Sequence, residues 1–340
     1  MKICLIVGGA LPKLGGLEKH FIELAKGLAE YCEVSVIAHG EYRKYFQDAD
    51  IEFIELNLDT SRFNIFLYLK LLGILKKNKF DVVHAQANKA AYIVSKLKKY
   101  LPSTRFVATI HNKKKNINYF NTMDFVVGVS NAVLEKIKAR KKVIYNGLDI
   151  QKIDLTQGYD LRKVFDIDNT FPIAVSVGRL VEAKGFDLLI EALQDININL
   201  LIVGDGKEQD NLEVMIKKYG KEKNIKILGF RDDALEIIKS ADFAIIASRR
   251  EGFSYVFAET LCLKKPLLST DVADVKFFIP AELVIKSPDV DLIREKITFY
   301  LQNKDKIDFS KYYDEARENF SMKNMILKTY QTYEEIVGDR

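Results

Sequence analysis

The stretch KICLIVGGALPKLGGLEKHFIELAKGLAEY (residues 2–31) joins three patterns that decide the fold. Residues 2–8 form an almost unbroken apolar run of strand length, which is typical of a strand buried on both faces of a parallel sheet. A glycine-rich loop (8–18) follows it. Residues 18–31 then place apolar side chains at helical spacing. This order of strand, loop and helix predicts the start of a doubly wound α/β domain.

The same alternation of strands and helices runs through all 340 residues and begins a second time near the middle of the chain. It predicts two Rossmann-like doubly wound domains that face each other across a cleft. We expect an N-terminal domain over 1–155, completed by a returning C-terminal helix (320–340), and a C-terminal domain over 156–319, with a polar linker at 149–160. The expected strands are 2–8, 34–38, 51–56, 81–86, 105–111, 125–130 and 142–146, then 172–178, 199–205, 225–230, 243–248, 266–271 and 283–285.

The composition is that of a globular protein, with 48% hydrophobic and 29% charged residues, and it excludes disordered and fibrous classes. Cys4, Cys32 and Cys262 are odd in number and lack metal or redox spacing, so we expect buried free thiols in a reducing compartment. No stretch reaches the roughly 20 apolar residues of a membrane span, and the best candidate (65–75) fits an amphipathic helix. We therefore expect a cytoplasmic protein.

Positive charge is concentrated in residues 84–142, which contain 13 Lys+Arg and 2 Asp+Glu. Such a stretch can attract an anionic membrane surface or a nucleic acid. A lysine-rich surface with no partner would give the same count, so that alternative stays open. Because the sequence contains no known nucleic-acid-binding module, we expect no nucleic acid.

Ligands of open parallel sheets bind beyond the carboxyl ends of the strands, so residues there are the site candidates. The loop 8–18 contains Gly15 and Gly16, which let a backbone approach an anion. It matches neither G-x-G-x-x-G nor G-x-x-x-x-G-K-[ST], and a tight turn would explain it equally. His111 ends the segment 105–111. A histidine at this position can have a structural or capping role, or it can be a functional residue of the cleft.

Two cations follow the first strand of the second half, in VGRLVEAKGFDLLIEAL (177–193). Arg179 comes directly after the strand, and Lys184 stands five residues later, before a helical pattern. A guanidinium, an ammonium and backbone amides are what a diphosphate requires. Two solvated surface cations are the alternative, but the position at a strand end favours a diphosphate site.

Two carboxylates flank an apolar turn in SRREGFSYVFAET (248–260). Glu251 lies at the turn after a strand, and Glu259 lies within the following helix, so each can reach a different part of one ligand. The alternative is that neither binds a ligand, with one glutamate solvated and the other on a helix surface. We also expect the amides at the helix start to point into the cleft, namely those of Gly252, Phe253 and Ser254.

Together these segments resemble family 4 of the retaining glycosyltransferases over nearly the whole chain. SRREGFSYVFAETL resembles the E-x7-E motif of that family, and VGRLVEAKGFDLLIEAL resembles its R-x4-K segment. GGLEKH, VSNAVLEKI, VIYNGLD and LIVGDGKEQDNLE stand in the order of the family. The resemblance implies a GT-B fold, with the acceptor held by the N-terminal domain and the nucleotide sugar by the C-terminal domain.

The matched positions imply a role for each candidate residue. Glu251 would contact the donor sugar near its reacting carbon, and Glu259 would contact the ribose hydroxyls. Arg179 and Lys184 would stabilise the charge of the leaving diphosphate. His111 would touch the sugar from the opposite domain, as a fourth catalytic residue beside Glu251, Arg179 and Lys184. Further contacts would come from Gly15 and Gly16 to the diphosphate, from Gly252, Phe253 and Ser254 to the sugar, and from Phe230 and Arg231 to the base.

The resemblance implies a retaining transfer of a hexose-type sugar from a nucleotide diphosphate sugar, with UDP favoured over GDP. The acceptor would be a glycan or a lipid-linked molecule in bacterial surface polysaccharide or lipopolysaccharide synthesis. The enzyme would act on the inner membrane face, where 84–142 would contact anionic lipid. We expect no metal or other cofactor, because no D-x-D stands at a strand end and two cations take the role of a metal. A transferase for a soluble acceptor, and an inactive donor-binding relative that serves as a partner subunit, are the alternatives.

One loop departs from the family. After PLLSTDV the family usually has a pair of glycines, whereas this chain has Ala273 and Asp274. An aspartate that faced a diphosphate would be unfavourable. We therefore expect either a re-aimed loop or a loop that helps to choose the sugar or the acceptor.

Overall fold

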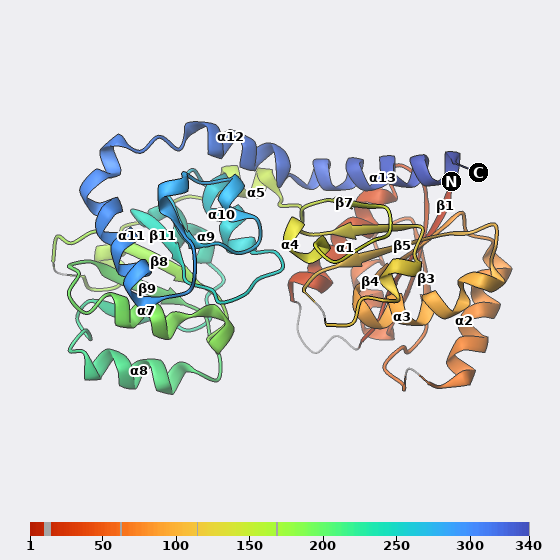
Figure 1. The fold of residues 1–340 in the computed structure, drawn as a ribbon, viewed down its shortest axis with the longest axis horizontal. Helices are drawn as coiled ribbons and strands as arrows, with labels where there is room; N and C mark the ends of the chain where they lie inside the picture. Colours follow the sequence, from red (N-terminus) through yellow and green to blue (C-terminus); the bar gives the residue numbers. More distant parts are fainter. Residues whose placement is uncertain (10–14, 62, 114, 168, 340) are drawn as a thin grey trace. The chain divides into compact units, whose positions relative to one another are not determined.

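The computed structural model describes residues 1–9, 15–61, 63–113, 115–167 and 169–339. The chain divides into two compact units, each a parallel sheet packed against helices (Figure 1). Unit 1 comprises Met1–Gly147 and Ser321–Arg340, and unit 2 comprises Leu148–Phe320. The expected α/β class with two Rossmann-like domains is confirmed.

Unit 1 contains a seven-stranded parallel sheet in the order β3-β2-β1-β4-β5-β6-β7. The chain winds outward from β1 in one direction and then from β4 in the other, so the topological switch point lies between β1 and β4. Ile3 pairs with Val34 on one side and with Val82 on the other. The strands are β1 (Lys2–Val7), β2 (Glu33–Ala38), β3 (Ile51–Glu55), β4 (Val82–Gln86), β5 (Arg105–Ile110), β6 (Phe125–Gly128) and β7 (Lys141–Val143).

In unit 1 the first and last helices of the chain, α1 (Gly16–Leu28) and α13 (Met322–Gly338), pack against each other. Gly27 permits this packing, because a Cβ there would lie 2.0 Å from Cδ1 of Ile326. The core that joins both helices to the sheet includes Phe21 and Tyr333. The remaining elements are η1 (Gly40–Tyr45), α2 (Ile65–Asn78), α3 (Ala87–Leu97), η2 (Lys98–Tyr100), η3 (Phe120–Thr122) and α4 (Asn131–Leu134).

Unit 2 contains a six-stranded parallel sheet in the order β10-β9-β8-β11-β12-β13, with its switch point between β8 and β11. Its strands are β8 (Ile173–Val177), β9 (Asn199–Val203), β10 (Ile225–Ile227), β11 (Phe243–Ile246), β12 (Leu267–Thr270) and β13 (Val284–Ile285). Its helices are α5 (Ile150–Leu155), α6 (Leu161–Val164), α7 (Phe186–Ala192), α8 (Gln209–Lys218), α9 (Ala234–Ser240), α10 (Tyr255–Cys262), α11 (Val290–Asn303) and α12 (Ser310–Asn319), with 3₁₀ turns η4 (Glu182–Lys184), η5 (Val275–Phe277), η6 (Ala281–Leu283) and η7 (Lys304–Lys306).

All the expected strand segments form strands, but several end earlier than their apolar runs suggest. β5 ends at Ile110, β8 at Val177 and β11 at Ile246. His111 and Ser248 consequently lie in loops beyond the carboxyl ends of their strands, where side chains can face a ligand.

The boundary between the units lies at Gly147–Leu148 rather than at 155–156, which corrects the sequence expectation. The segment 149–160, expected to be a linker, contains helix α5, and α5 packs against α10 of unit 2. Asp154 at its end also accepts a hydrogen bond from Nη2 of Arg317 at 2.8 Å. Polar composition suggested a linker, but these contacts make the segment part of unit 2.

The segment 65–75 is helical, as α2, but it is not cleanly amphipathic, because Phe66 and Leu69 on its outer face are exposed. No helix in the described ranges is long and apolar enough to span a bilayer. The three cysteines are free; Cys4 and Cys262 are buried, whereas Cys32 is half-buried. Burial raises the pKa of Cys262 to about 12. Its thiol is therefore protonated at neutral pH.

Candidate active site

In unit 2 the candidate site lies at the switch point of the sheet. β8 and β11 are hydrogen-bonded neighbours. The chain leaves β8 toward β9 on one side and leaves β11 toward β12 on the other. Ligands of open α/β sheets bind beyond the carboxyl ends of the strands at this position. The two loops that follow β8 and β11 therefore provide the first candidates.

The loop after β8 carries Arg179 and Lys184 and approaches the end of β11 closely. Its turn η4 is followed by Gly185, which has φ +67°. A Cβ on Gly185 would lie 2.1 Å from the carbonyl oxygen of Ala247. Glycine is therefore required here both by conformation and by contact. Arg179 is exposed, whereas Lys184 is half-buried.

Lys184 and Glu251 form an ion pair between the two loops, with side chains that are 21% and 11% exposed. Oε1 of Glu251 also accepts a hydrogen bond from the hydroxyl of Ser248 at 2.9 Å. The carbonyl of Ser248 in turn accepts from the hydroxyl of Thr270 at 2.7 Å. The structure thus brings together a cation and a carboxylate that the sequence assigned to one ligand, and it anchors the carboxylate to two strand ends.

A second ion pair holds the same two loops together. The guanidinium of Arg249 donates to both oxygens of Asp187, at 2.7 Å and 2.5 Å, and to the carbonyl of Glu182 at 2.7 Å. Burial would raise the pKa of Asp187, but the hydrogen bonds and charge of Arg249 outweigh it and lower the pKa below its ordinary value. Asp187 is therefore ionised at neutral pH and fixes the loop that carries Lys184.

The turn into α10 presents the predicted amide groups at the start of a helix. Ser254 is the N-cap, and its hydroxyl oxygen accepts a hydrogen bond from the amide of Phe257 at 3.3 Å. In the part of the chain that the structure describes, the amides of Gly252 and Ser254 donate to no protein acceptor. Glu259 lies in α10 and is half-buried.

Aromatic rings pack below this turn, as the apolar sequence between Glu251 and Glu259 suggests. Phe320 contacts Phe253 and Phe257, with ring centroids 5.8 Å and 5.2 Å apart. The packing supports the backbone from which Glu251 projects.

Phe230 and Arg231, predicted to lie beside the base, follow the edge strand β10 at the same carboxyl edge. Phe230 is 70% exposed. The guanidinium of Arg231 is engaged by both oxygens of Asp233, each at 2.7 Å, and lies over the ring of Phe165. Hydrogen bonding to Asp233 raises the pKa of Arg231. Of the predicted pair, Phe230 has the larger free surface.

The loop after β12, where this chain has Ala273 and Asp274 in place of a glycine pair, has a backbone conformation that glycine adopts most easily. Ala273 and Asp274 have φ of +51° and +67°, and both are buried. This left-handed conformation costs a residue with a side chain roughly 1–2 kcal/mol, although aspartate tolerates it better than most. The loop thus has a bend that glycine would adopt without strain, and it carries a carboxyl group there.

In unit 1 a buried polar network spans the ends of β4 and β5. His111 Nε2 lies 3.0 Å from Oε1 of Gln86, and Nε2 of His84 lies 2.7 Å from the hydroxyl of Thr109. Nδ1 of His84 lies 2.5 Å from the hydroxyl of Tyr333 in α13. Because an amide oxygen can only accept, His111 donates from Nε2. The other ring nitrogen of neutral His111 is then unprotonated.

Burial keeps the histidines of this region neutral. It lowers the pKa of His84 to about 3 and that of His20 to about 4, and it lowers that of His111 well below its ordinary value. The ring of His20, from α1, meets that of His111 edge-on with centroids 4.9 Å apart. A hydrogen bond with Asn146 acts to raise the pKa of His20, but the effect of burial is larger.

Gly15 and Gly16 are at the start of α1, and part of their loop (10–14) lies outside the described residues. The amide of Gly15 donates to Oε2 of Glu18 at 3.0 Å. A diphosphate would have to replace this carboxylate to use that amide. The predicted diphosphate contact of these glycines therefore stays a prediction.

Sequence reasoning missed the residues that position the candidates. Arg249 and Asp187 belong to no recognised sequence motif. The only signal was that each is a charged residue close to a loop predicted to hold site residues. His84 and Gln86 left a clearer signal, because two polar residues interrupt the otherwise apolar strand VVHAQ. A buried polar residue in such a strand needs a partner. His84 finds Thr109 and Tyr333, and Gln86 finds His111.

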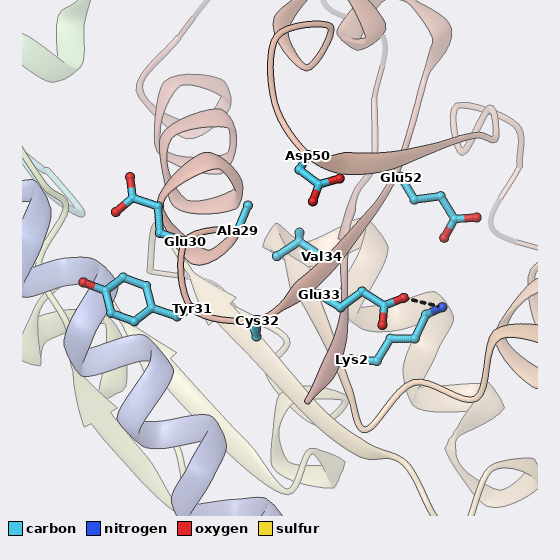
Figure 2. Close-up of a pocket in the computed structure, with 9 residues that line it drawn as sticks. All are labelled: Lys2, Ala29, Glu30, Tyr31, Cys32, Glu33, Val34, Asp50 and Glu52. Atoms are coloured by element: carbon cyan, nitrogen blue, oxygen red, sulfur yellow. Dashed lines mark ion pairs between the residues drawn. The ribbon is translucent and has the colours of Figure 1, made fainter.

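A hollow of about 730 Å³ lies at the opposite edge of the unit 1 sheet, near the amino ends of β1 and β2. Four of the nine residues that line it are acidic, and Figure 2 shows Glu30, Asp50 and Glu52 around it, while Lys2 pairs with Glu33 at 2.8 Å. Acidic walls repel phosphate, and the amino edge is not where such sheets bind ligands. This hollow is therefore not the candidate site.

Comparison with known proteins agrees with this geometry. The family described as "Glycosyl transferases group 1" matches residues 159–320, and "Glycosyltransferase Family 4" matches residues 14–152. The chain belongs to glycosyltransferase family 4. The protein is accordingly a glycosyltransferase.

Two curated relatives and two solved structures illustrate the similarity. The glycosyltransferase is 26% identical over 280 residues to the lipopolysaccharide core biosynthesis glycosyltransferase LpsE of Rhizobium meliloti, covering 78% of this chain and 79% of LpsE. It is 24% identical over 301 residues to the N-acetyl-alpha-D-glucosaminyl L-malate synthase of Bacillus anthracis, covering 78% of each chain.

Among solved structures, Anabaena Alr3699/HepE in complex with UDP superposes with a TM-score of 0.83 at 22% identity, covering 98% of this chain and 100% of HepE. A glycosyltransferase from Rickettsia africae also gives 0.83, at 23% identity, covering 100% and 99%. These likenesses confirm the expected GT-B fold.

Proposed function

We propose that this glycosyltransferase transfers a hexose-type sugar from a UDP-sugar, with retention of anomeric configuration, to a growing surface glycan or its lipid-linked precursor. The observation that carries the proposal is the meeting of Lys184 and Glu251 at the switch point of unit 2. A cation and a hydroxyl-binding carboxylate at one point match the two chemical parts of a sugar diphosphate.

The reaction breaks the bond between the anomeric carbon and the diphosphate, so negative charge grows on the leaving group. Lys184 and the exposed Arg179 are the cations available to stabilise that charge, which is the kind of interaction that contributes most to catalysis. Their charge takes the role of a metal ion, so we propose a reaction without a metal or other cofactor. Gly15 and Gly16 would add amides to the diphosphate if the carboxylate of Glu18 moves away.

Glu251 is proposed to bind sugar hydroxyls near the reacting carbon. The free amides of Gly252 and Ser254 would assist it, with Phe253 in the same turn. Glu259 would bind the ribose. Phe230, with Arg231 behind it, would offer its ring to the base. His111 would complete the catalytic set from unit 1, and its lowered pKa leaves the imidazole neutral.

Named relatives support the choice of donor and acceptor. HepE has been crystallised with UDP and with UDP-glucose, which favours UDP over GDP. Its 20–22% identity supports fold similarity alone, so the donor rests on analogy. LpsE and the O-antigen biosynthesis glycosyltransferase WclY of Escherichia coli favour surface polysaccharide synthesis. A surface glycan made on a lipid carrier would place the enzyme on the cytoplasmic face of the membrane.

A transferase for a small soluble acceptor is the second candidate. The Bacillus anthracis relative is named an N-acetyl-alpha-D-glucosaminyl L-malate synthase, and its name contains the small hydroxy acid malate. It matches the same share of this chain as LpsE does. The two candidate functions share the same donor site and differ only in the acceptor that receives the sugar.

The test uses the purified full chain. Calorimetric titration with UDP, GDP, ADP and CMP identifies the base, and release of UDP from UDP-hexoses is then measured with membrane extract or with small hydroxy acids as acceptor. Preferential binding of UDP and transfer to lipid-extractable material support the proposal. Binding of UDP without transfer to any acceptor would instead indicate the inactive donor-binding relative. NMR of the product's anomeric proton decides retention.

A further inference from the structure

Helix α2 of unit 1 exposes apolar side chains on the face opposite the one it buries. The buried side chains are Leu67, Leu71 and Leu75. The exposed ones are Phe66, which is 78% exposed, and Ile65 and Leu69, each 60% exposed; Phe63, just before the helix, is 78% exposed. No other large apolar side chain in the described part of unit 1 is as exposed as these four. Clustered exposed apolar side chains, unlike single scattered ones, are typical of an interaction site.

The same segment is positively charged and contains no acid. Residues 60–80 include five Lys+Arg and no Asp or Glu. The exposed lysines Lys70, Lys76, Lys77 and Lys79 form no ion pair with any carboxylate that the structure describes. Apolar anchors therefore stand beside uncompensated positive charge, which is the pattern of a helix that lies in a membrane interface.

The basic stretch 84–142 is less suited to a membrane than its charge suggests. Lys98 pairs with Asp124 at 2.6 Å, and Arg140 pairs with Glu335 at 2.6 Å. Among the described residues of this stretch, the one large apolar side chain that is exposed is Tyr100. Part of its charge is thus neutralised within unit 1, and it lacks the apolar component that α2 provides.

We propose that the α2 face docks unit 1 on an anionic phospholipid bilayer. The α2 face is defined as Phe63, Ile65, Phe66, Leu69, Lys70, Lys76, Lys77 and Lys79. Its apolar side chains would enter the boundary between headgroups and acyl chains, and its lysines would contact lipid phosphates. The inference uses no residue of the donor site, so it does not depend on the proposed donor.

A bilayer fits this face better than the other anionic or apolar partners. A second copy of the chain would bring lysines against lysines, with no carboxylate on the face to neutralise them. A nucleic acid would pair with the lysines but would leave Ile65 and Leu69 in water. Anionic lipid offers phosphate and apolar chains together.

The first experiment places a reporter on the face. The chain contains no tryptophan, so Phe66→Trp gives a single emission signal. Its emission should shift to shorter wavelength with phosphatidylcholine vesicles that contain 30% phosphatidylglycerol, and not with vesicles of phosphatidylcholine alone. Val214→Trp on α8, at a site that is 68% exposed, is the matched control and should not shift. Equal shifts at both positions, or none at Phe66→Trp, would overturn the assignment.

The second experiment removes charge. Lys76→Gln/Lys77→Gln should weaken sedimentation with the anionic vesicles at least tenfold, because each lysine near an anionic surface contributes about fivefold. Lys217→Gln/Lys218→Gln, from the last turn of α8, should leave sedimentation unchanged. Binding by the α2 variant equal to wild type would refute the proposal. Concentration-dependent dimers that Phe63→Ser/Phe66→Ser abolishes, without vesicle binding by the wild type, would assign the face to a second copy instead.

Discussion

Lys184 and Glu251 lie 67 positions apart in the sequence and form an ion pair at the carboxyl ends of the neighbouring strands β8 and β11. Each side chain is mostly withdrawn from water, so each provides the other's counter-charge. A sugar diphosphate would give both groups new partners, phosphate oxygens for the ammonium and hydroxyls for the carboxylate. The pair therefore keeps two ligand-binding groups at one point with their charges satisfied.

We expect Glu251→Gln to lower kcat at least a hundredfold while UDP binding stays within about threefold of wild type, because the carboxylate is assigned to the sugar and not to the nucleotide. Steady-state kinetics and calorimetry measure the two effects. Glu222→Gln, at an exposed position in unit 2, is the control and should behave as wild type. Near-normal turnover by Glu251→Gln would remove this residue from the catalytic set.

Lys184→Met should weaken both donor binding and turnover, because its charge serves the bound substrate and the transition state alike. It should also be coupled to Glu251. In a double-mutant cycle of thermal stability, the double variant should be more stable than the sum of the two single effects predicts, since each single change leaves one charge without its partner. Additive effects would show that the ion pair does not persist in solution.

Transfer should not require a divalent metal. Activity after dialysis against EDTA should remain within about twofold of the untreated enzyme, because Arg179 and Lys184 supply the charge that a metal would supply. Loss of activity with EDTA that Mg²⁺ or Mn²⁺ restores would contradict this prediction.

Gly185→Ala should destabilise unit 2 by about 3 kcal/mol, because left-handed strain adds to the overlap of the new Cβ with the carbonyl oxygen of Ala247. Gly220→Ala is the matched control, since Gly220 has a similar φ of +62° and open space around it. The control should lose only the roughly 1 kcal/mol of left-handed strain. Urea unfolding measures both, and equal losses would mean that the loop moves aside.

Unit 1 should lose stability in mild acid. His20 and His84 have pKa values of about 4 and about 3 in the folded chain, below the ordinary 6.5. The unfolded chain therefore binds protons more readily, so the stabilisation is complete above about pH 6.5 and declines as pH falls toward 4. Urea unfolding between pH 7.5 and 5, followed by hydrogen exchange to resolve the two units, checks this. A variant with His84→Gln should show a shallower decline.

The sequence predicted the two sheets well because the strands are buried on both faces and must be apolar throughout. Ile3 and Leu200, for example, are fully buried in the centres of their sheets. The domain boundary was less predictable. Residues 149–160 are polar, and only the packing of α5 against α10 shows that they belong to unit 2.

The candidate residues were predictable where the chain carries a spaced motif. Arg179, Lys184, Glu251 and Glu259 stand in two short segments, and the alternation of strands and helices already places both segments at strand ends. The residues that hold them were not predictable. Arg249 engages Asp187, 62 positions earlier in the sequence, and neither shows a local pattern.

By itself, the sequence determined the order of strands and helices and the chemical types of residue at the strand ends, because burial and helical periodicity are local properties. Only the tertiary structure decided which of those residues meet. Lys184 reaches Glu251, and His84 reaches Tyr333, because the winding of each sheet brings distant strand ends and helices together. It also decided that the apolar residues at the start of α2 remain in solvent, whereas the sequence predicted an amphipathic helix there.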